Sequence, residues 1–145
     1  MRWVDPHSDD FRFGLWSRVT DCLTRLKGKH PKHCDWDVDE IRDGLFTEEY
    51  GLIDFGDLFA ILEEVDGFAA VRIACAYDGH TISLGDHAAK LNEAITRAGY
   101  RGLIFSTARA GWGRVAEKAG FREYSRTVEY IYVGDDDEKT KGTAD

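Results

Sequence analysis

Three residue types that bind zinc are consecutive in the chain, in the order His33-Cys34-Asp35, and His30 lies shortly before them. A structural zinc site usually has two pairs of ligands, with roughly two to four residues between the members of each pair. The sequence has no second pair at a separate place, so we expect no metal and interpret segment 30–35 as a polar loop between two helices. Cys22 and Cys75 lie in otherwise apolar patterns, which is typical of free buried thiols.

The formal net charge of −8 argues against some classes of partner. Proteins that bind nucleic acid without sequence preference, or an anionic membrane surface, need clustered Lys and Arg side chains. We therefore expect no nonspecific nucleic-acid binding and no membrane partner, whereas a small amine or a basic protein is easier to accommodate as a substrate. No apolar run reaches the roughly 20 residues of a membrane-spanning helix, and Met1 is not followed by the apolar segment of a secretion signal. These features predict a cytoplasmic protein.

With 145 residues, 43% of them hydrophobic and 32% charged, the chain is long enough for one domain with a substantial core. We predict that residues 1–133 form this single domain. Residues 134–145 are charged and carry no large apolar side chain, so we expect a disordered acidic tail.

Helical patterns dominate the first third of the chain. Arg2–Val4 is a short strand candidate. Between Asp10 and Lys27, apolar residues recur every three or four positions, which predicts an amphipathic helix. Asp37 can cap a second helix, which we expect to end at Gly51.

Strand patterns follow in the middle of the chain. Leu58–Leu62 and Phe68–Tyr77 are strand candidates, and Asp66-Gly67 between them is a strong hairpin signal. Asp78-Gly79 makes a further turn, so we expect His80–Leu84 to form a short strand that leads into a loop.

The next stretch reads as helix, buried strand and helix. Asp86 can cap a helix that stops at Gly99, where glycine allows the left-handed conformation. Leu103–Phe105 is a continuous apolar run, typical of a strand covered on both faces. We expect another helix from about Ala110 to Ala119. The remaining strands are expected at Glu123-Tyr124 and Thr127–Val133, merged or separate.

The segment Gly111-Trp-Gly-Arg-Val-Ala-Glu-Lys-Ala-Gly-Phe121 resembles the last helix of the GNAT acyltransferases, in which a Lys-apolar-Gly-Phe turn precedes the sixth strand. The order of elements is similar to that family over most of the chain. The resemblance implies an α/β (α+β) fold with a mixed, mostly antiparallel sheet of six to seven strands. It further implies that this sheet is splayed between strands 4 and 5 and flanked by about four helices.

The resemblance also implies a site for acetyl-CoA. In the family, a loop of pattern Gln/Arg-x-x-Gly-x-Gly/Ala before a helix holds the pyrophosphate through backbone N–H groups. The aligned segment here is Ile82-Ser-Leu-Gly-Asp-His87, which keeps Gly85 but has Ile82 and His87 where the family usually has other residues. The cofactor-binding residues that the resemblance implies are Leu84, Gly85, Asp86, His87, Ala88, Arg109 and Arg114.

The catalytic residues implied by the resemblance are a base that takes a proton from the amine and an acid for the leaving thiolate. His80 and Glu64 are the candidate bases, with Glu63 as an alternative to Glu64, and Tyr124 is the candidate acid. The tyrosine that the family often uses falls at Ala116. Ordinary turn and strand roles explain these residues as well, because Tyr is common in strands and charged residues are common in turns.

Two functions follow from the resemblance. One is an N-acetyltransferase that moves an acetyl group from acetyl-CoA to a primary amine. The other is an inactive GNAT-like binding or structural module, similar to GNAT-like proteins of bacteriophages. Either could act as a homodimer. Binding of acetyl-CoA is the property that separates the two functions.

Overall fold

The computed structural model describes residues 1–32, 34–77, 84–107, 122–126 and 130–135. The chain divides into two compact units, and we describe each unit by itself. The first comprises Met1–Glu63 and Arg72–Ile82, and the second comprises Glu64–Val71 and Ser83–Asp145.

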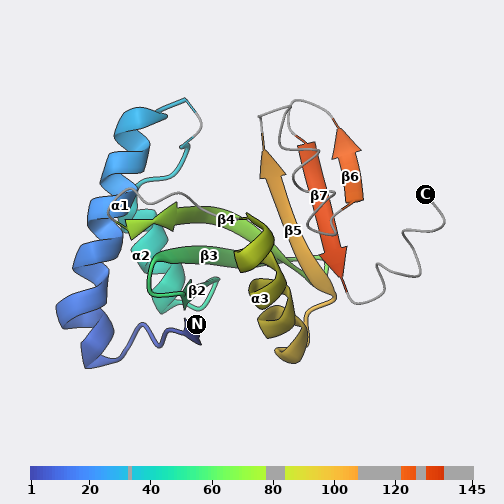
Figure 1. The fold of residues 1–145 in the computed structure, drawn as a ribbon. Helices are drawn as coiled ribbons and strands as arrows, with labels where there is room; N and C mark the ends of the chain where they lie inside the picture. The colour runs from blue at the N-terminus through green and yellow to red at the C-terminus, as the bar shows by residue number, and fades with distance from the viewer. Residues whose placement is uncertain (33, 78–83, 108–121, 127–129, 136–145) are drawn as a thin grey trace. The chain divides into compact units, whose positions relative to one another are not determined.

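The helices of the first unit are η1 (a π-helix, Phe11–Leu15), α1 (Trp16–Lys29) and α2 (Val38–Phe46) (Figure 1). The first two are continuous and confirm the helix predicted between Asp10 and Lys27. Their apolar stripe is buried in the core, as the helical spacing requires: Phe11, Leu15, Val19, Cys22 and Leu23. Asp37 caps α2 as predicted, because its carboxylate accepts a hydrogen bond from the backbone N–H of Glu40 at 2.8 Å.

The strands of the first unit are β1 (Arg2–Trp3), β2 (Tyr50–Asp54), β3 (Leu58–Val65) and β4 (Phe68–Ala76), the last two continuing into the second unit. The prediction that α2 runs to Gly51 was wrong, since α2 ends at Phe46 and Gly51 lies inside β2. Gly51 is in a strand because β2 pairs antiparallel with β3 along its whole length, and local sequence signals do not reveal this pairing. The predicted hairpin at Asp66-Gly67 is confirmed, with φ values of 52° and 86° at these two residues.

The remaining elements of the second unit are α3 (Leu84–Arg97), β5 (Gly102–Thr107), β6 (Arg122–Arg126) and β7 (Tyr130–Asp135). A strand was predicted at residues 80–84. This was wrong for Leu84, which is the first residue of α3, and residues 80–83 lie outside the described residues. Gly99 ends the helical segment as predicted, with a φ of 96°. The helix expected from Ala110 to Ala119 also lies outside the described residues.

Hydrogen bonds join the strands in the order β1-β2-β3-β4-β5-β7-β6. The pairing of β4 with β5 is parallel and is limited to Ala69 with Leu103 and Ala70 with Ile104. β5 pairs antiparallel with β7, and β7 pairs antiparallel with β6. A mixed, mostly antiparallel sheet with accompanying helices is therefore confirmed, whereas the splay between two of its strands stays a prediction.

The boundary expected after Val133 is two residues too early. β7 continues through Gly134 and Asp135, which lie opposite Leu103 and Gly102 of β5. The two residues are in a strand because β5 offers them backbone partners, a feature that composition alone does not reveal. Residues 136–145 lie outside the described residues.

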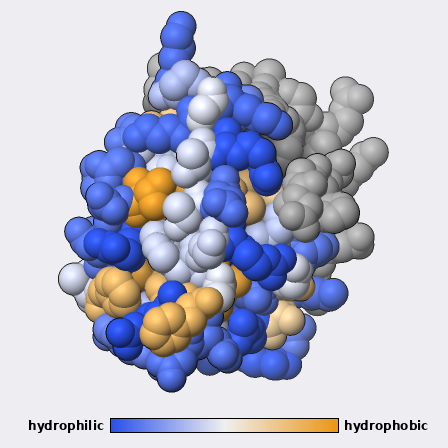
Figure 2. All heavy atoms as spheres, turned by 90° about the vertical axis from the view of Figure 1, so that its left-hand side faces the viewer, coloured by the Kyte–Doolittle hydropathy of each residue, from blue (hydrophilic) through white to orange (hydrophobic). Residues whose placement is uncertain are grey.

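The face of the molecule shown in Figure 2 is mainly hydrophilic, with a few hydrophobic side chains between polar ones. Large apolar side chains that are exposed on the described part of the chain include Phe13, at 81%, and Trp3, at 44%. Among the described residues, no helix has the length and apolar character needed to cross a membrane.

Candidate functional site

Tyr50, the first residue of β2, is the centre of a polar cluster in the first unit. Its ring packs against α2 at Gly44, where a Cβ would approach the ring to within 2.3 Å. The ring is therefore held between the helix and the strands, and glycine at position 44 makes this approach possible.

An ion pair lies beside this ring. Glu63 of β3 is directly opposite Tyr50 in the antiparallel register. One carboxylate oxygen of Glu63 lies 3.4 Å from Nη1 of Arg72, which comes from β4. The Arg72 guanidinium is also 5.7 Å from the centre of the Tyr50 ring. Three neighbouring strands thus bring together a phenol, a carboxylate and a guanidinium.

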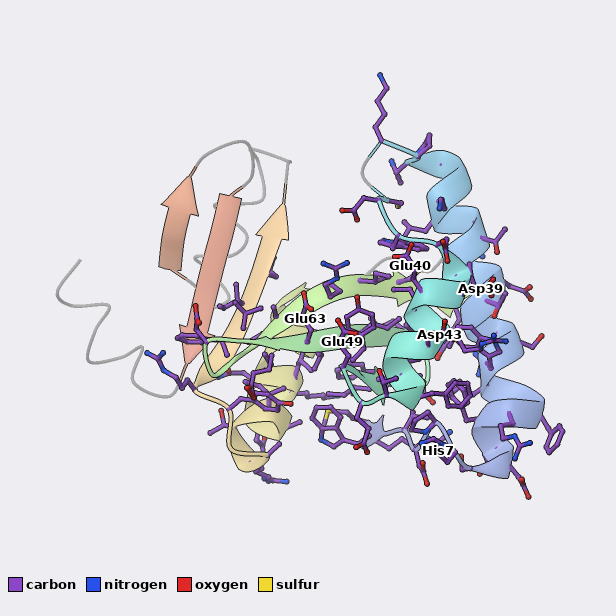
Figure 3. All side chains as sticks on the ribbon, turned by 180° about the vertical axis from the view of Figure 1, so that it is seen from behind. His7, Asp39, Glu40, Asp43, Glu49 and Glu63 are labelled. Atoms are coloured by element: carbon purple, nitrogen blue, oxygen red, sulfur yellow. The ribbon has the colours of Figure 1, made fainter. Side chains whose placement is uncertain are left out.

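Further carboxylates act on the Tyr50 hydroxyl through their charge. Burial raises the pKa of Tyr50; Arg72 opposes this effect, and the negative charges of Glu49, Glu63 and Glu40 add to it. We call Tyr50, Glu40, Glu49, Glu63 and Arg72 the tyrosine–carboxylate cluster. Figure 3 labels Glu40, Glu49 and Glu63 together with two further carboxylates of α2, Asp39 and Asp43. Among the groups that act on the Tyr50 hydroxyl, three carboxylates stand against one guanidinium, so the local field there is negative and favours cations.

A second polar network in the first unit joins Asp54 and Tyr77. The Tyr77 hydroxyl donates to Oδ1 of Asp54 at 3.1 Å, and the backbone N–H of Gly56 donates to the same oxygen at 3.0 Å. Arg2 Nε lies 3.6 Å from the other carboxylate oxygen, and the Arg18 guanidinium lies 4.0 Å from the centre of the Tyr77 ring. Because each of these polar groups has a partner, the network serves to hold the β2–β3 turn against the end of β4.

The start of α3 is the candidate anion site of the second unit. The helix begins at Leu84, so Asp86 lies in its first turn and not at the cap position that the sequence suggested. Acidic residues are favoured both at the cap and in the first turn, so the residue types locate the helix start only to within a few residues. The first N–H groups of a helix have no partner within the helix, and together with its dipole they suit a phosphate. The backbone N–H groups near Gly85 are therefore candidates for holding a pyrophosphate.

The predicted catalytic residues are only partly described. His80 lies outside the described residues, as do Arg109 and Arg114. Glu64 is exposed near the end of β3. Tyr124 lies at an irregularity of β6, where the pairing with β7 shifts register between Glu123 and Ser125.

Sequence reasoning missed most of the tyrosine–carboxylate cluster. Glu63 was considered as an alternative base, but Tyr50 and Arg72 were not singled out. The only available signal was the acidic character of residues 39–49, because the cluster depends on the register of three strands. Among the described residues, no group of three metal-binding side chains gathers at one place.

The fold was compared with those of solved structures. A protein from Bacteroides thetaiotaomicron, described as a candidate acetyltransferase from the GNAT family, is similar over 99% of this chain and 93% of its own, with a TM-score of 0.62 and 14% identity. The chain has the GNAT fold. A second candidate GNAT acetyltransferase, from Desulfovibrio desulfuricans, covers 68% of this chain and 78% of its own, with a TM-score of 0.50 and 17% identity. No protein-family model and no curated protein sequence matches the chain.

The helix α3 begins with residues that the sequence predicts to bind pyrophosphate. In the family resemblance, the loop that binds pyrophosphate precedes the helix after the fourth strand. Among the described residues, β4 is the fourth strand and α3 is the next helix. Leu84–Ala88 form the beginning of this helix.

Proposed function

We propose that the protein is a cytoplasmic N-acyltransferase that transfers an acetyl group from acetyl-CoA to a primary amine. The observation that carries the proposal is the GNAT fold, in which α3 follows the fourth strand and begins with the residues predicted to bind pyrophosphate. The cytoplasmic location is supported by three cysteines that are all free, as is usual in a reducing compartment.

Acetyl-CoA supplies the acetyl group as a thioester. Backbone N–H groups of residues 84–88 hold its pyrophosphate, and Gly85 permits a close approach of the backbone to the ligand. Arg109 and Arg114 add positive charge toward the phosphates. Asp86 weakens the binding, because its carboxylate repels the phosphate at a helix terminus that otherwise favours it.

The acceptor is a small amine or a basic protein that carries further positive charge. The tyrosine–carboxylate cluster supports this choice, because its negative field attracts an ammonium group and repels anionic competitors. Glu63 lies in this cluster, whereas Glu64 is exposed near the end of the same strand. Recognition of the acceptor therefore falls to Glu63 and its neighbours.

Transfer requires three proton movements. His80 or Glu64 takes a proton from the ammonium form of the acceptor, and the neutral amine attacks the thioester carbonyl. The C–N bond forms and the C–S bond breaks, and the leaving thiolate takes up a proton from Tyr124. The attacking nitrogen then loses its second proton, which restores the Tyr124 hydroxyl by way of solvent. The family resemblance assigns this role to Tyr124, which belongs to β6.

A transfer assay with three classes of acceptor tests the proposal. The protein is incubated with acetyl-CoA and a polyamine, a lysine-rich peptide or a neutral amino sugar, and the acetylated product and free CoA thiol are measured. We expect product with the cationic acceptors, and a KM that rises as the salt concentration increases.

The matched variants are Glu63→Gln and Asp21→Asn, which each remove one negative charge. Asp21 is exposed on α1 and serves as the control. Glu63→Gln should raise the KM for a cationic acceptor severalfold, whereas Asp21→Asn should leave it unchanged. Absence of product with every acceptor, or equal effects of the two substitutions, contradicts the proposed acceptor class.

A further inference from the structure

Two buried thiols meet between α1 and β4 in the first unit. Cys22 of α1 is 3% exposed and Cys75 of β4 is 8% exposed. The Cys22 sulfur lies 3.8 Å from the carbonyl oxygen of Ala76, and the Cys75 sulfur lies 3.7 Å from the same oxygen. The Cys75 sulfur is also 3.9 Å from the carbonyl oxygen of Cys22. The two thiols are therefore neighbours although 53 residues separate them in the sequence.

A guanidinium lies beside the pair. Nη2 of Arg25 is 3.8 Å from the Cys22 sulfur and 2.9 Å from the Ala76 carbonyl oxygen. A positive charge next to a sulfur stabilises the thiolate, which is the nucleophilic form. Burial raises the pKa of Cys75, the nearby Cys22 raises it further, and Arg25 opposes both effects. Cys22, which accepts a hydrogen bond from Arg25, is thus the better placed of the two to react first.

We propose that Cys22 and Cys75 form an oxidative modification site, in which a small peroxide converts the two thiols into a reversible disulfide between α1 and β4. The proposal rests on the juxtaposition of the two sulfurs and Arg25, and it is independent of the proposed acyl transfer. A small peroxide is the oxidant because both sulfurs are buried and larger disulfide reagents are excluded.

The reaction is balanced in two steps. The Cys22 thiolate attacks one peroxide oxygen, the O–O bond breaks, and Cys22 becomes a sulfenic acid while the other oxygen leaves as water after protonation. The Cys75 thiol then attacks the Cys22 sulfur, the S–O bond breaks, and a second water leaves as the S–S bond forms. Two thiols are oxidised by two electrons in total, and one hydrogen peroxide is reduced to two waters.

The third cysteine supplies the internal control. Cys34 is also buried, at 7% exposed, but its sulfur contacts the carbonyl oxygen of Leu26 at 4.0 Å. Its size, burial and free state match those of the pair. Cys34 should therefore remain a free thiol under conditions that oxidise the pair.

The test treats the full chain with hydrogen peroxide under native conditions, followed by alkylation of the remaining thiols and mass spectrometry. We expect wild-type protein and Cys34→Ala to lose two hydrogen atoms and two alkylation sites, and dithiothreitol to restore both. Cys22→Ala and Cys75→Ala should each abolish this change. Arg25→Gln should slow it, whereas Arg25→Lys should retain most of the rate.

Thermal unfolding of the oxidised wild-type protein adds a measurement that needs no substitution. Closing a loop of this length should raise the midpoint by about 5 to 10 °C relative to the reduced protein. Wild-type protein that keeps both thiols alkylatable, or that forms the disulfide only in urea, overturns the proposal. So does a disulfide that includes Cys34.

Discussion

The ring of Tyr50 lies directly on Gly44 of α2, so that a Cβ at position 44 would be 2.3 Å from Cδ2 and 2.5 Å from Cε2 of the ring. Real Cβ atoms do not approach other atoms this closely. The contact fixes how closely α2 approaches β2, and α2 carries Glu40 of the tyrosine–carboxylate cluster. Gly44 is consequently important for both the stability of the first unit and the geometry of the cluster.

Gly44→Ala should destabilise the protein by about 1 to 3 kcal/mol, because the added methyl group forces the Tyr50 ring or α2 to move. The matched control is Gly28→Ala, which places the same methyl group in α1, where no atom lies within 4 Å. That change should stabilise the protein by up to about 1 kcal/mol, since alanine favours helix more than glycine. Urea unfolding of both variants measures the difference. A Gly44→Ala protein as stable as wild type would contradict the close contact.

Tyr77 should make stability depend on alkaline pH. Burial, followed by the negative charge of Asp54 and its hydrogen bond, raises the pKa of Tyr77 above the ordinary value of 10.0. The unfolded chain therefore loses this proton first as the pH rises. The stability contributed by the protonated tyrosine is complete below about pH 10 and falls above that value.

Tyr77→Phe should remove the loss of stability at alkaline pH that comes from ionisation of Tyr77. At neutral pH the variant should be less stable by about 1 to 3 kcal/mol, because the buried Asp54 loses the hydroxyl donor. Thermal unfolding between about pH 7 and pH 11 follows both effects. If the wild-type and variant midpoints fall in parallel above pH 10, the placement of Tyr77 beside Asp54 is wrong.

Gly67 combines a left-handed conformation with a close neighbour in the second unit. Its φ is 86°, and a Cβ there would be 2.7 Å from Cδ of Arg101. The Arg101 guanidinium lies 4.4 Å from the centre of the Phe68 ring and donates to the carbonyl oxygen of Asp66 at 3.1 Å, so moving the arginine away breaks these contacts. Gly67→Ala should lower the stability of the protein in two ways. The left-handed backbone conformation costs about 1 kcal/mol with alanine, and the clash with Arg101 costs a similar amount.

Gly56 separates these two costs, because its φ is 94° and no atom lies within 4 Å of its would-be Cβ. Gly56→Ala should therefore show the conformational cost alone. Adding Arg101→Ala to Gly67→Ala should recover the steric cost, and the interaction energy from this double-mutant cycle measures it. Equal losses for Gly56→Ala and Gly67→Ala, with no coupling to Arg101, would contradict the contact.

Local signals in the sequence predicted a large part of the fold. The helix from residue 11 to residue 29 follows from its apolar spacing, and the cap at Asp37 from its residue type. Asp66-Gly67 was predicted correctly because a turn with two positive φ values has few suitable residue pairs. Each of these features depends on residues that are close together in the sequence.

The features that sequence reasoning missed depend on distant residues. Gly51 of β2 looks like the end of a helix when only the residues next to it in the sequence are considered. Its strand conformation comes from the pairing of β2 with β3. The tyrosine–carboxylate cluster requires that pairing, because only the register places Glu63 opposite Tyr50. The pyrophosphate-binding residues Leu84–Ala88 were predicted from the family resemblance, and they do begin a helix. His80 and Arg109, two other predicted site residues, lie outside the described residues.

Calorimetric titration with acetyl-CoA tests the central claim most directly. Wild-type protein should release heat and bind at a single site, and Asp86→Asn should bind about 0.3 to 1 kcal/mol more tightly because it removes a negative charge from the helix start. Gly85→Val should abolish binding, whereas Ala89→Val, at an exposed position of α3, should preserve it. No heat and no thermal shift with wild-type protein at millimolar acetyl-CoA would contradict the acyltransferase account.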